Sequence, residues 1–161
     1  MKVRFLTKNP KQTKKIGKIL AKEILKIHFE KQAFILGLEG DLGGGKTTFL
    51  QGFAKGLGIK QKVISPTFVI MKKFDIPHYT FNNLYHLDCY RIEKPKELLS
   101  LGFKDIISYP TNIVAIEWVD KIKTLLPKNR LIIKFLFIND TTREIVLEYN
   151  NDWGQKKTPY Y

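Results

Sequence analysis

The sequence predicts an α/β fold with a mixed, mainly parallel central sheet that is flanked by helices and carries a C-terminal β-hairpin. One observation is an apolar run at 33–38 that is followed by a glycine-rich turn and a helical segment. Another is a β-branched apolar run at 112–118 that reads as a strand. The third is a pair of segments rich in β-formers, 131–138 and 143–149, which a polar turn joins into a hairpin.

The N-terminal segment is predicted to form a short strand at 3–6 and then a helix. Asn9 suits the N-cap of this helix, Pro10 its first position, and Gln12 the third position after the cap. We expect the helix to pack against the sheet through one apolar face, made of Ile16, Ile19, Leu20, Ile24 and Ile27.

Further elements follow the glycine-rich turn. A helix is expected from about Lys46 to Leu57, and Gly58 ends it. The chain length suits one domain at 1–150, with a polar tail at 151–161. The remaining elements are expected in this order: a strand at 68–71, a turn at 75–80, a strand at 83–88, a short helix at 96–101 between Pro95 and Gly102, the strand at 112–118, a short helix at 120–126 ended by Pro127, and the hairpin.

The turn at 40–48 fits the phosphate-binding pattern G-x-x-x-x-G-K-[ST] between a strand and a helix, as that pattern requires. Glycines let the backbone turn tightly, so that successive N–H groups point at a di- or triphosphate. Lys46 can reach the terminal phosphates, the Thr47 hydroxyl can hold Mg²⁺, and the helix N-terminus adds a positive dipole. The sequence therefore predicts a P-loop NTPase whose nucleotide-binding loop consists of Gly40, Asp41, Leu42, Gly43, Gly44, Gly45, Lys46, Thr47 and Thr48.

Phosphate chemistry also needs a carboxylate on the other side of Mg²⁺ and a group that orients the attacking water. Two acids end apolar strands: Glu117 ends the stronger one and Asp88 ends the strand at 83–88. For each, the alternative is an ordinary strand-end carboxylate that caps a loop. We expect Lys46, Asp88 and Glu117 to act in catalysis, and Thr47 and Glu117 to ligate Mg²⁺.

Four more residues are candidates for switch or partner contacts, each with a plainer alternative. Thr67 could sense the terminal phosphate, or be a turn hydroxyl. His86 would share a strand face with Asp88, although a lone histidine is more often structural and no second ligand lies at metal spacing. Arg91 could reach phosphate or form a surface salt bridge, and Trp118 could stack, shape a partner surface or belong to the core.

The composition is strongly basic, with a formal net charge of +13. Such a surface could attract tRNA, DNA or an acidic protein, but scattered lysines and only four arginines also fit simple compositional drift. One cysteine excludes an internal disulfide. Without a signal-like segment or a run of 18 apolar residues, we expect a cytoplasmic protein with no membrane association.

Several motifs occur in one order: the glycine-rich loop, Ser65-Pro66-Thr67-Phe68, His86-Leu87-Asp88-Cys89-Tyr90-Arg91, Leu101-Gly102-Phe103 and Ile116-Glu117-Trp118. With them the chain resembles the small bacterial ATPase subunit of the tRNA threonylcarbamoyladenosine biosynthesis machinery, over roughly residues 5–149. The resemblance implies binding of ATP or ADP with Mg²⁺, and ATP hydrolysis in association with two partner subunits. One partner carries the transfer chemistry on the adenosine beside the tRNA anticodon, so the small subunit resets or regulates the complex and meets tRNA only indirectly.

The resemblance also assigns roles to residues by position. Thr47 and Glu117 match the Mg²⁺ residues, Asp88 and Trp118 match positions implicated in activity, and the segment from Thr7 to Thr13 lies where the family contacts adenine. Two other classes stay open. A small-molecule kinase would need clustered arginines and a mobile lid, and a nucleotide-gated RNA-binding module would explain the charge.

Overall fold

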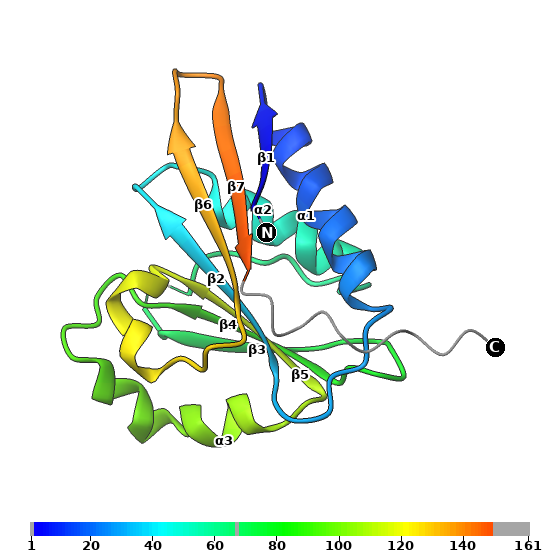
Figure 1. Ribbon diagram of the computed structural model, residues 1–161, viewed down its shortest axis with the longest axis vertical. Helices are drawn as coiled ribbons and strands as arrows, with labels where there is room; N and C mark the ends of the chain where they lie inside the picture. The colour runs from blue at the N-terminus through cyan, green and yellow to red at the C-terminus, as the bar shows by residue number, and fades with distance from the viewer. Residues whose placement is uncertain (1, 67, 150–161) are drawn as a thin grey trace.

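The computed structural model describes residues 2–66 and 68–149, so the predicted tail at 151–161 and the candidate Thr67 lie outside the described residues. Within them, one seven-stranded mixed sheet forms the centre of the molecule (Figure 1). The strand order is β1-β7-β6-β2-β5-β4-β3. The bounds are Lys2–Thr7 for β1, Phe34–Gly40 for β2, Met71–Asp75 for β3, Asn83–Asp88 for β4, Asn112–Glu117 for β5, Leu131–Phe137 for β6 and Arg143–Tyr149 for β7.

Strand direction divides the sheet into a parallel centre and antiparallel edges. The four central strands β6, β2, β5 and β4 run parallel, whereas β1, β7 and β3 pair antiparallel with their neighbours. The connections from β3 to β4 and from β6 to β7 are too short for a crossover, which explains two of the three antiparallel pairs. The predicted α/β class and mixed sheet are confirmed, but "mainly parallel" holds only for the four central strands.

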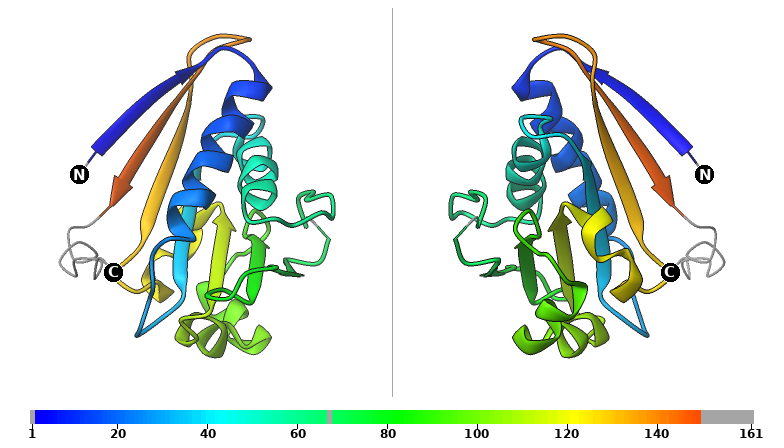
Figure 2. Two further views of the ribbon diagram at one scale, coloured as in Figure 1. Left: turned by 90° about the vertical axis from the view of Figure 1, so that its right-hand side faces the viewer. Right: turned by 90° about the vertical axis from the view of Figure 1, so that its left-hand side faces the viewer.

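Helices cover both faces of the sheet. Because side chains alternate along β2, Phe34, Leu36 and Leu38 face one hydrophobic cluster and Ala33 and Ile35 face another. The first cluster is covered by α1 (Pro10–Ile24) and α2 (Lys46–Gly56), which lie side by side (Figure 2). The second is covered by the 3₁₀ helices η1 (Pro95–Leu101) and η2 (Val119–Leu125) and by the short helix α3 (Phe103–Ser108). None of the described helices is long and apolar enough to cross a membrane.

Several predicted elements are confirmed, one predicted strand is wrong and one helix was not predicted. The Asn9 side chain caps α1 by accepting a hydrogen bond from the Gln12 N–H at 3.0 Å, and both β4 and the β6–β7 hairpin form as predicted. The predicted strand at 68–71 is wrong, since β3 begins at Met71 and the side chains of Phe68 and Val69 are exposed. Helix α3 was not predicted; it begins directly after Gly102, whose φ is 76°.

The predicted apolar face of α1 is only partly correct. Ile16, Leu20 and Ile24 pack on the core, but Ile19 and Ile27 are 52% and 41% exposed. The most buried line of α1 combines Ile24 with smaller residues, of which Gly17 and Ala21 face α2, because this helix packs against another helix as well as against the sheet. That line comprises Thr13, Gly17, Ala21 and Ile24.

Glycines allow the close approach of α1 and α2. A Cβ atom added to Gly52 of α2 would lie 2.0 Å from the Lys14 carbonyl oxygen of α1, and one added to Gly17 would lie 2.3 Å from the Phe49 carbonyl oxygen. Both obstacles are backbone atoms, so a larger residue would force the helices apart.

We predict that Gly52→Ala lowers the free energy of unfolding by about 1–3 kcal/mol, because overpacking outweighs alanine's better helix propensity. The midpoint and slope of urea unfolding would measure this, with Lys55→Ala on the exposed side of the same helix as the control. A Gly52→Ala protein as stable as the unchanged chain would contradict the tight contact.

Candidate functional site

The glycine-rich loop joins the carboxyl end of β2 to the first turn of α2. Gly40, Gly43 and Gly45 have φ values of 143°, 74° and 101°, which favour glycine. A Cβ atom on Gly40 would also lie 2.6 Å from the Phe135 carbonyl oxygen of β6. No side-chain hydrogen bond caps the start of α2 at Gly45. The positive end of α2 and its first-turn N–H groups are therefore arranged to meet an anion.

Lys46 lies buried at the centre of this loop, with 4% of its surface exposed. Its ammonium group donates hydrogen bonds to the carbonyl oxygens of Gly40 at 2.6 Å and Asp41 at 2.8 Å. It also lies 4.3 Å from the centre of the Trp118 ring. Burial lowers the pKa of Lys46, while the charges of Glu117 and Asp88 oppose this shift. An anionic ligand at the loop would offset the free-energy cost of burying this charged ammonium group.

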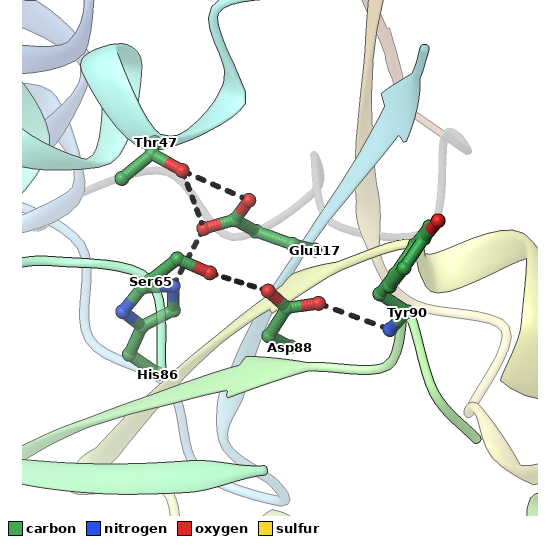
Figure 3. A network of polar contacts seen from close by, with 6 residues as sticks. All are labelled: Thr47, Ser65, His86, Asp88, Tyr90 and Glu117. Atoms are coloured by element: carbon green, nitrogen blue, oxygen red, sulfur yellow. Dashed lines mark hydrogen bonds and ion pairs between the residues drawn. The ribbon is translucent and has the colours of Figure 1, made fainter. Parts of the chain in front are cut away.

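Glu117 connects the loop to the centre of the sheet (Figure 3). The Thr47 hydroxyl lies 3.1 Å from each oxygen of the Glu117 carboxylate, and His86 Nε2 lies 2.8 Å from Oε1. Glu117 and His86 are both buried, and His86 Nδ1 has no hydrogen-bond partner among the described atoms. The parallel register of β4 and β5 makes this possible, because it sets Asp88 beside Glu117 and His86 beside Ala115.

Asp88 is held by two hydrogen bonds at the end of β4 (Figure 3). Its carboxylate accepts one from the Ser65 hydroxyl and one, at 3.0 Å, from the Tyr90 backbone N–H. The side chain is 8% exposed, so it is fixed but still accessible from one side. This carboxylate lines the pocket described below.

Trp118 follows β5 with an unusual backbone. Its φ is 58°, a conformation that non-glycine residues rarely adopt and that is often found at functional sites. This turns its half-buried indole ring over Lys46 and against the Tyr90 ring, at a centroid distance of 5.1 Å. Trp118 therefore forms one wall of the site.

These side chains line one pocket with a volume of about 340 Å³. It lies at the carboxyl ends of the parallel strands β2, β4 and β5, where open α/β sheets usually bind ligands. Its lining comprises loop residues 42–48 together with Ser65, Asp88, Tyr90, Glu117 and Trp118.

A second hollow of about 250 Å³ shares the loop residues Gly43, Gly45 and Thr48 with this pocket. Its other walls come from the Thr7–Pro10 segment and Thr13, and from Asp140, Thr141 and Arg143 at the β6–β7 turn. Inside it, the Thr13 hydroxyl donates a hydrogen bond of 3.0 Å to the Thr7 hydroxyl. The two hollows together form an elongated site that crosses the glycine-rich loop.

The oxygen atoms around Thr47 fit a magnesium ion. A hydroxyl and a carboxylate are hard ligands of the kind that Mg²⁺ prefers, and Mg²⁺ keeps several waters or phosphate oxygens besides its protein ligands. Two protein ligands, Thr47 and Glu117, would therefore be sufficient. Among the described residues no group of three His, Cys, Asp or Glu side chains is arranged to hold a metal ion.

Most of the residues predicted for the site come together in the structure. Arg91 does not: its side chain is exposed and its guanidinium group lies over the Phe68 ring at 5.4 Å. Sequence reasoning did not select Ser65 or Tyr90 as site residues. Their only signal was membership of the ordered motifs, and the hydrogen bonds to Asp88 arise from the tertiary fold.

Comparison with known proteins identifies the family. A family model described as threonylcarbamoyl adenosine biosynthesis protein TsaE matches residues 7–145. The chain belongs to the TsaE family. The tRNA threonylcarbamoyladenosine biosynthesis protein TsaE of Bacillus subtilis is 41% identical over 146 residues, which are 89% of this chain and 83% of that protein. The protein of the same name from Haemophilus influenzae is 34% identical over 137 residues, with 84% of each chain covered.

A solved structure supports the same family. The crystal structure of Bacillus subtilis YdiB superposes with a TM-score of 0.73 at 35% sequence identity, and the match covers 95% of this chain and 89% of that one. TsaE family membership assigns the chain to threonylcarbamoyladenosine biosynthesis in tRNA. The resemblance drawn from the ordered motifs is thereby confirmed.

Proposed function

We propose that this chain is a P-loop ATPase that binds ATP or ADP with Mg²⁺ in a single domain, residues 1–150. The observation that carries this proposal is the buried ammonium group of Lys46 inside a glycine-rich loop, in one pocket with the Glu117 and Asp88 carboxylates. Phosphate groups would replace the carbonyl oxygens of Gly40 and Asp41 as partners of Lys46. The first-turn N–H groups of α2 would bind the same phosphates.

Thr47 and Glu117 would hold Mg²⁺, which on binding neutralises charge on the phosphate oxygens. His86 contacts the same Glu117 oxygen, Oε1, as Thr47 does, and so helps to hold the carboxylate beside the loop. Asp88 would orient the attacking water, since its carboxylate is held by Ser65 and Tyr90 at the pocket wall. The hollow at Thr7–Thr13 would take the adenine ring.

We infer further that the chain acts with two partner subunits of the modification machinery. One partner would carry out the transfer to the adenosine beside the anticodon, and ATP hydrolysis by this chain would reset or regulate it. This assignment rests on membership of the TsaE family and on the lack of an arginine that could stabilise the charge of the transition state in the pocket. No arginine is among the described residues that line the 340 Å³ pocket. The cytoplasm, which holds both ATP and tRNA, is the expected compartment.

The purified chain alone should therefore hydrolyse ATP slowly, and adding the two partners should accelerate it. In related phosphoryl-transfer enzymes, an arginine supplied by a partner raises the turnover rate about 10³- to 10⁵-fold. We therefore expect the partners to raise the turnover rate of this chain by at least about tenfold. Phosphate release with and without the partners measures this, and Lys46→Ala in the same mixtures controls for contaminating ATPases. Fast turnover by the chain alone that the partners leave unchanged would contradict the proposal and favour an autonomous ATPase or a kinase.

A further inference from the structure

A second, strongly basic surface lies along α1 and α2. Two adjoining hollows of about 480 and 350 Å³ share Lys14, Gln51 and Lys55 in their lining. The close contact through Gly52 brings these side chains of the two helices together, since it leaves no space between the backbones. We call this surface the lysine groove; its lysines are Lys11, Lys14, Lys15, Lys18, Lys55, Lys60 and Lys62.

The charge of the lysine groove is not compensated locally. All seven lysines are exposed, and none of them forms an ion pair within the described part of the chain. The sequence holds no Asp or Glu before residue 23 and none from residue 42 to residue 74. Helix α1 up to residue 22 and the stretch from α2 to residue 64 therefore carry no acidic side chain, so all their charged side chains are positive. Like charges this close repel one another, so a polyanion that binds them would relieve a real electrostatic cost.

The chemistry of the groove favours nucleic acid over an acidic protein. Protein interfaces are anchored by buried aromatic side chains and arginines, and neither lines the groove among the described residues. Its other walls are glycines, Gln51 and Gln61, with the buried side chains of Ile59 and Val63. Lysine is a point charge that binds phosphate without demanding one geometry, which suits a repeating backbone.

We propose that the lysine groove binds the phosphate backbone of RNA directly, independently of base sequence. The RNA would be the tRNA substrate of the modification system to which the TsaE family belongs. The lysines of α1 recur every three or four residues and so follow one side of the helix. Phosphates would bind along this row and across the groove to Lys55 and Lys60. This contact is separate from the nucleotide pocket, which shares none of these lysines.

Filter binding of an unmodified tRNA transcript to the full chain, from about 50 to 200 mM salt, tests this proposal. The test variant is Lys14→Gln, Lys18→Gln, Lys55→Gln and Lys60→Gln combined. The matched control combines Lys31→Gln, Lys73→Gln, Lys96→Gln and Lys104→Gln, which are exposed lysines outside the groove. Both variants lower the net charge by the same amount, so a difference between them reports location.

We expect the groove variant to bind tRNA at least about tenfold more weakly than the control variant. The slope of log affinity against log salt should also fall by about one for each lost phosphate contact. Mg-ATP affinity should be unchanged in both variants. The tRNA result can therefore succeed or fail independently of the ATPase proposal. Two outcomes of this assay would overturn the inference: no tRNA binding by the unchanged chain, or equal losses in the two variants. Polyglutamate, an acidic polypeptide, is added as a competitor, and its displacement of tRNA from the chain would also overturn the inference.

Discussion

Lys46→Ala is expected to weaken Mg-ATP binding by about 100-fold or more while the chain still folds. The ammonium group is buried and makes two short hydrogen bonds within the loop, so it is already directed to the place where phosphates would bind. Hydrogen bonds to a charged group contribute about 1.5–3 kcal/mol each, and about 1.4 kcal/mol is a factor of ten in affinity. Losing two such contacts to phosphate accounts for the expected size.

Calorimetric titration with Mg-ATP measures this affinity, and circular dichroism checks the fold. Lys121→Ala is the control, because Lys121 is an exposed lysine near the same pocket whose ammonium group contacts the Tyr90 ring. The control should bind Mg-ATP within about twofold of the unchanged chain, because Lys121 contacts Tyr90 rather than the loop and its charge is screened by solvent. If folded Lys46→Ala kept full affinity, the glycine-rich loop would not be the phosphate site.

Glu117→Gln and Asp88→Asn are expected to fail in different ways. Glu117→Gln should reduce ATP hydrolysis by about 10²-fold or more and also remove most of the Mg²⁺ dependence of ATP binding, since it deletes the charge beside Thr47. Asp88→Asn should reduce hydrolysis by a similar factor of about 10² while leaving most of the binding intact, as expected for a group that orients water. Both replacements keep the size of the side chain and its place in the hydrogen-bond network.

The two variants are compared by ATP affinity with and without Mg²⁺ and by turnover in the presence of the partner subunits. Ser65→Ala is a useful companion variant, because it removes one hydrogen bond to Asp88 without changing either carboxylate. It should lower turnover less than Asp88→Asn does. The opposite pattern, with Mg²⁺ dependence lost in Asp88→Asn and kept in Glu117→Gln, would exchange the two assignments.

Short-range patterns predicted much of the fold. The Asn9 cap, the hairpin of β6 and β7, and the strand–loop–helix unit around Lys46 all depend on residues within a few positions of one another. Local sequence therefore contains the physical cause of each. The segment at 68–71 misled the prediction because its apolar residues look like a strand, while in the folded chain Phe68 and Val69 face solvent.

Long-range packing determined the rest. Nothing in the spacing of α1 showed that its small residues would face α2, because that depends on glycines some 35 positions later that let two backbones touch. The same holds for the contact between His86 and Glu117, which exists only because β4 and β5 pair in parallel with one register.

From the sequence alone, the glycine-rich loop pattern and the two strand-end acids could be identified, since each lies in a short contiguous segment. The family could be identified as well, because several such segments occur in one order along the chain. Only the tertiary structure brought Lys46, Asp88, Glu117 and Trp118 into one pocket and collected the dispersed lysines of α1 and α2 into one groove. The reason is physical: the chemical type of a side chain is local, but its distance from another side chain is set by the packing of the whole sheet and its helices.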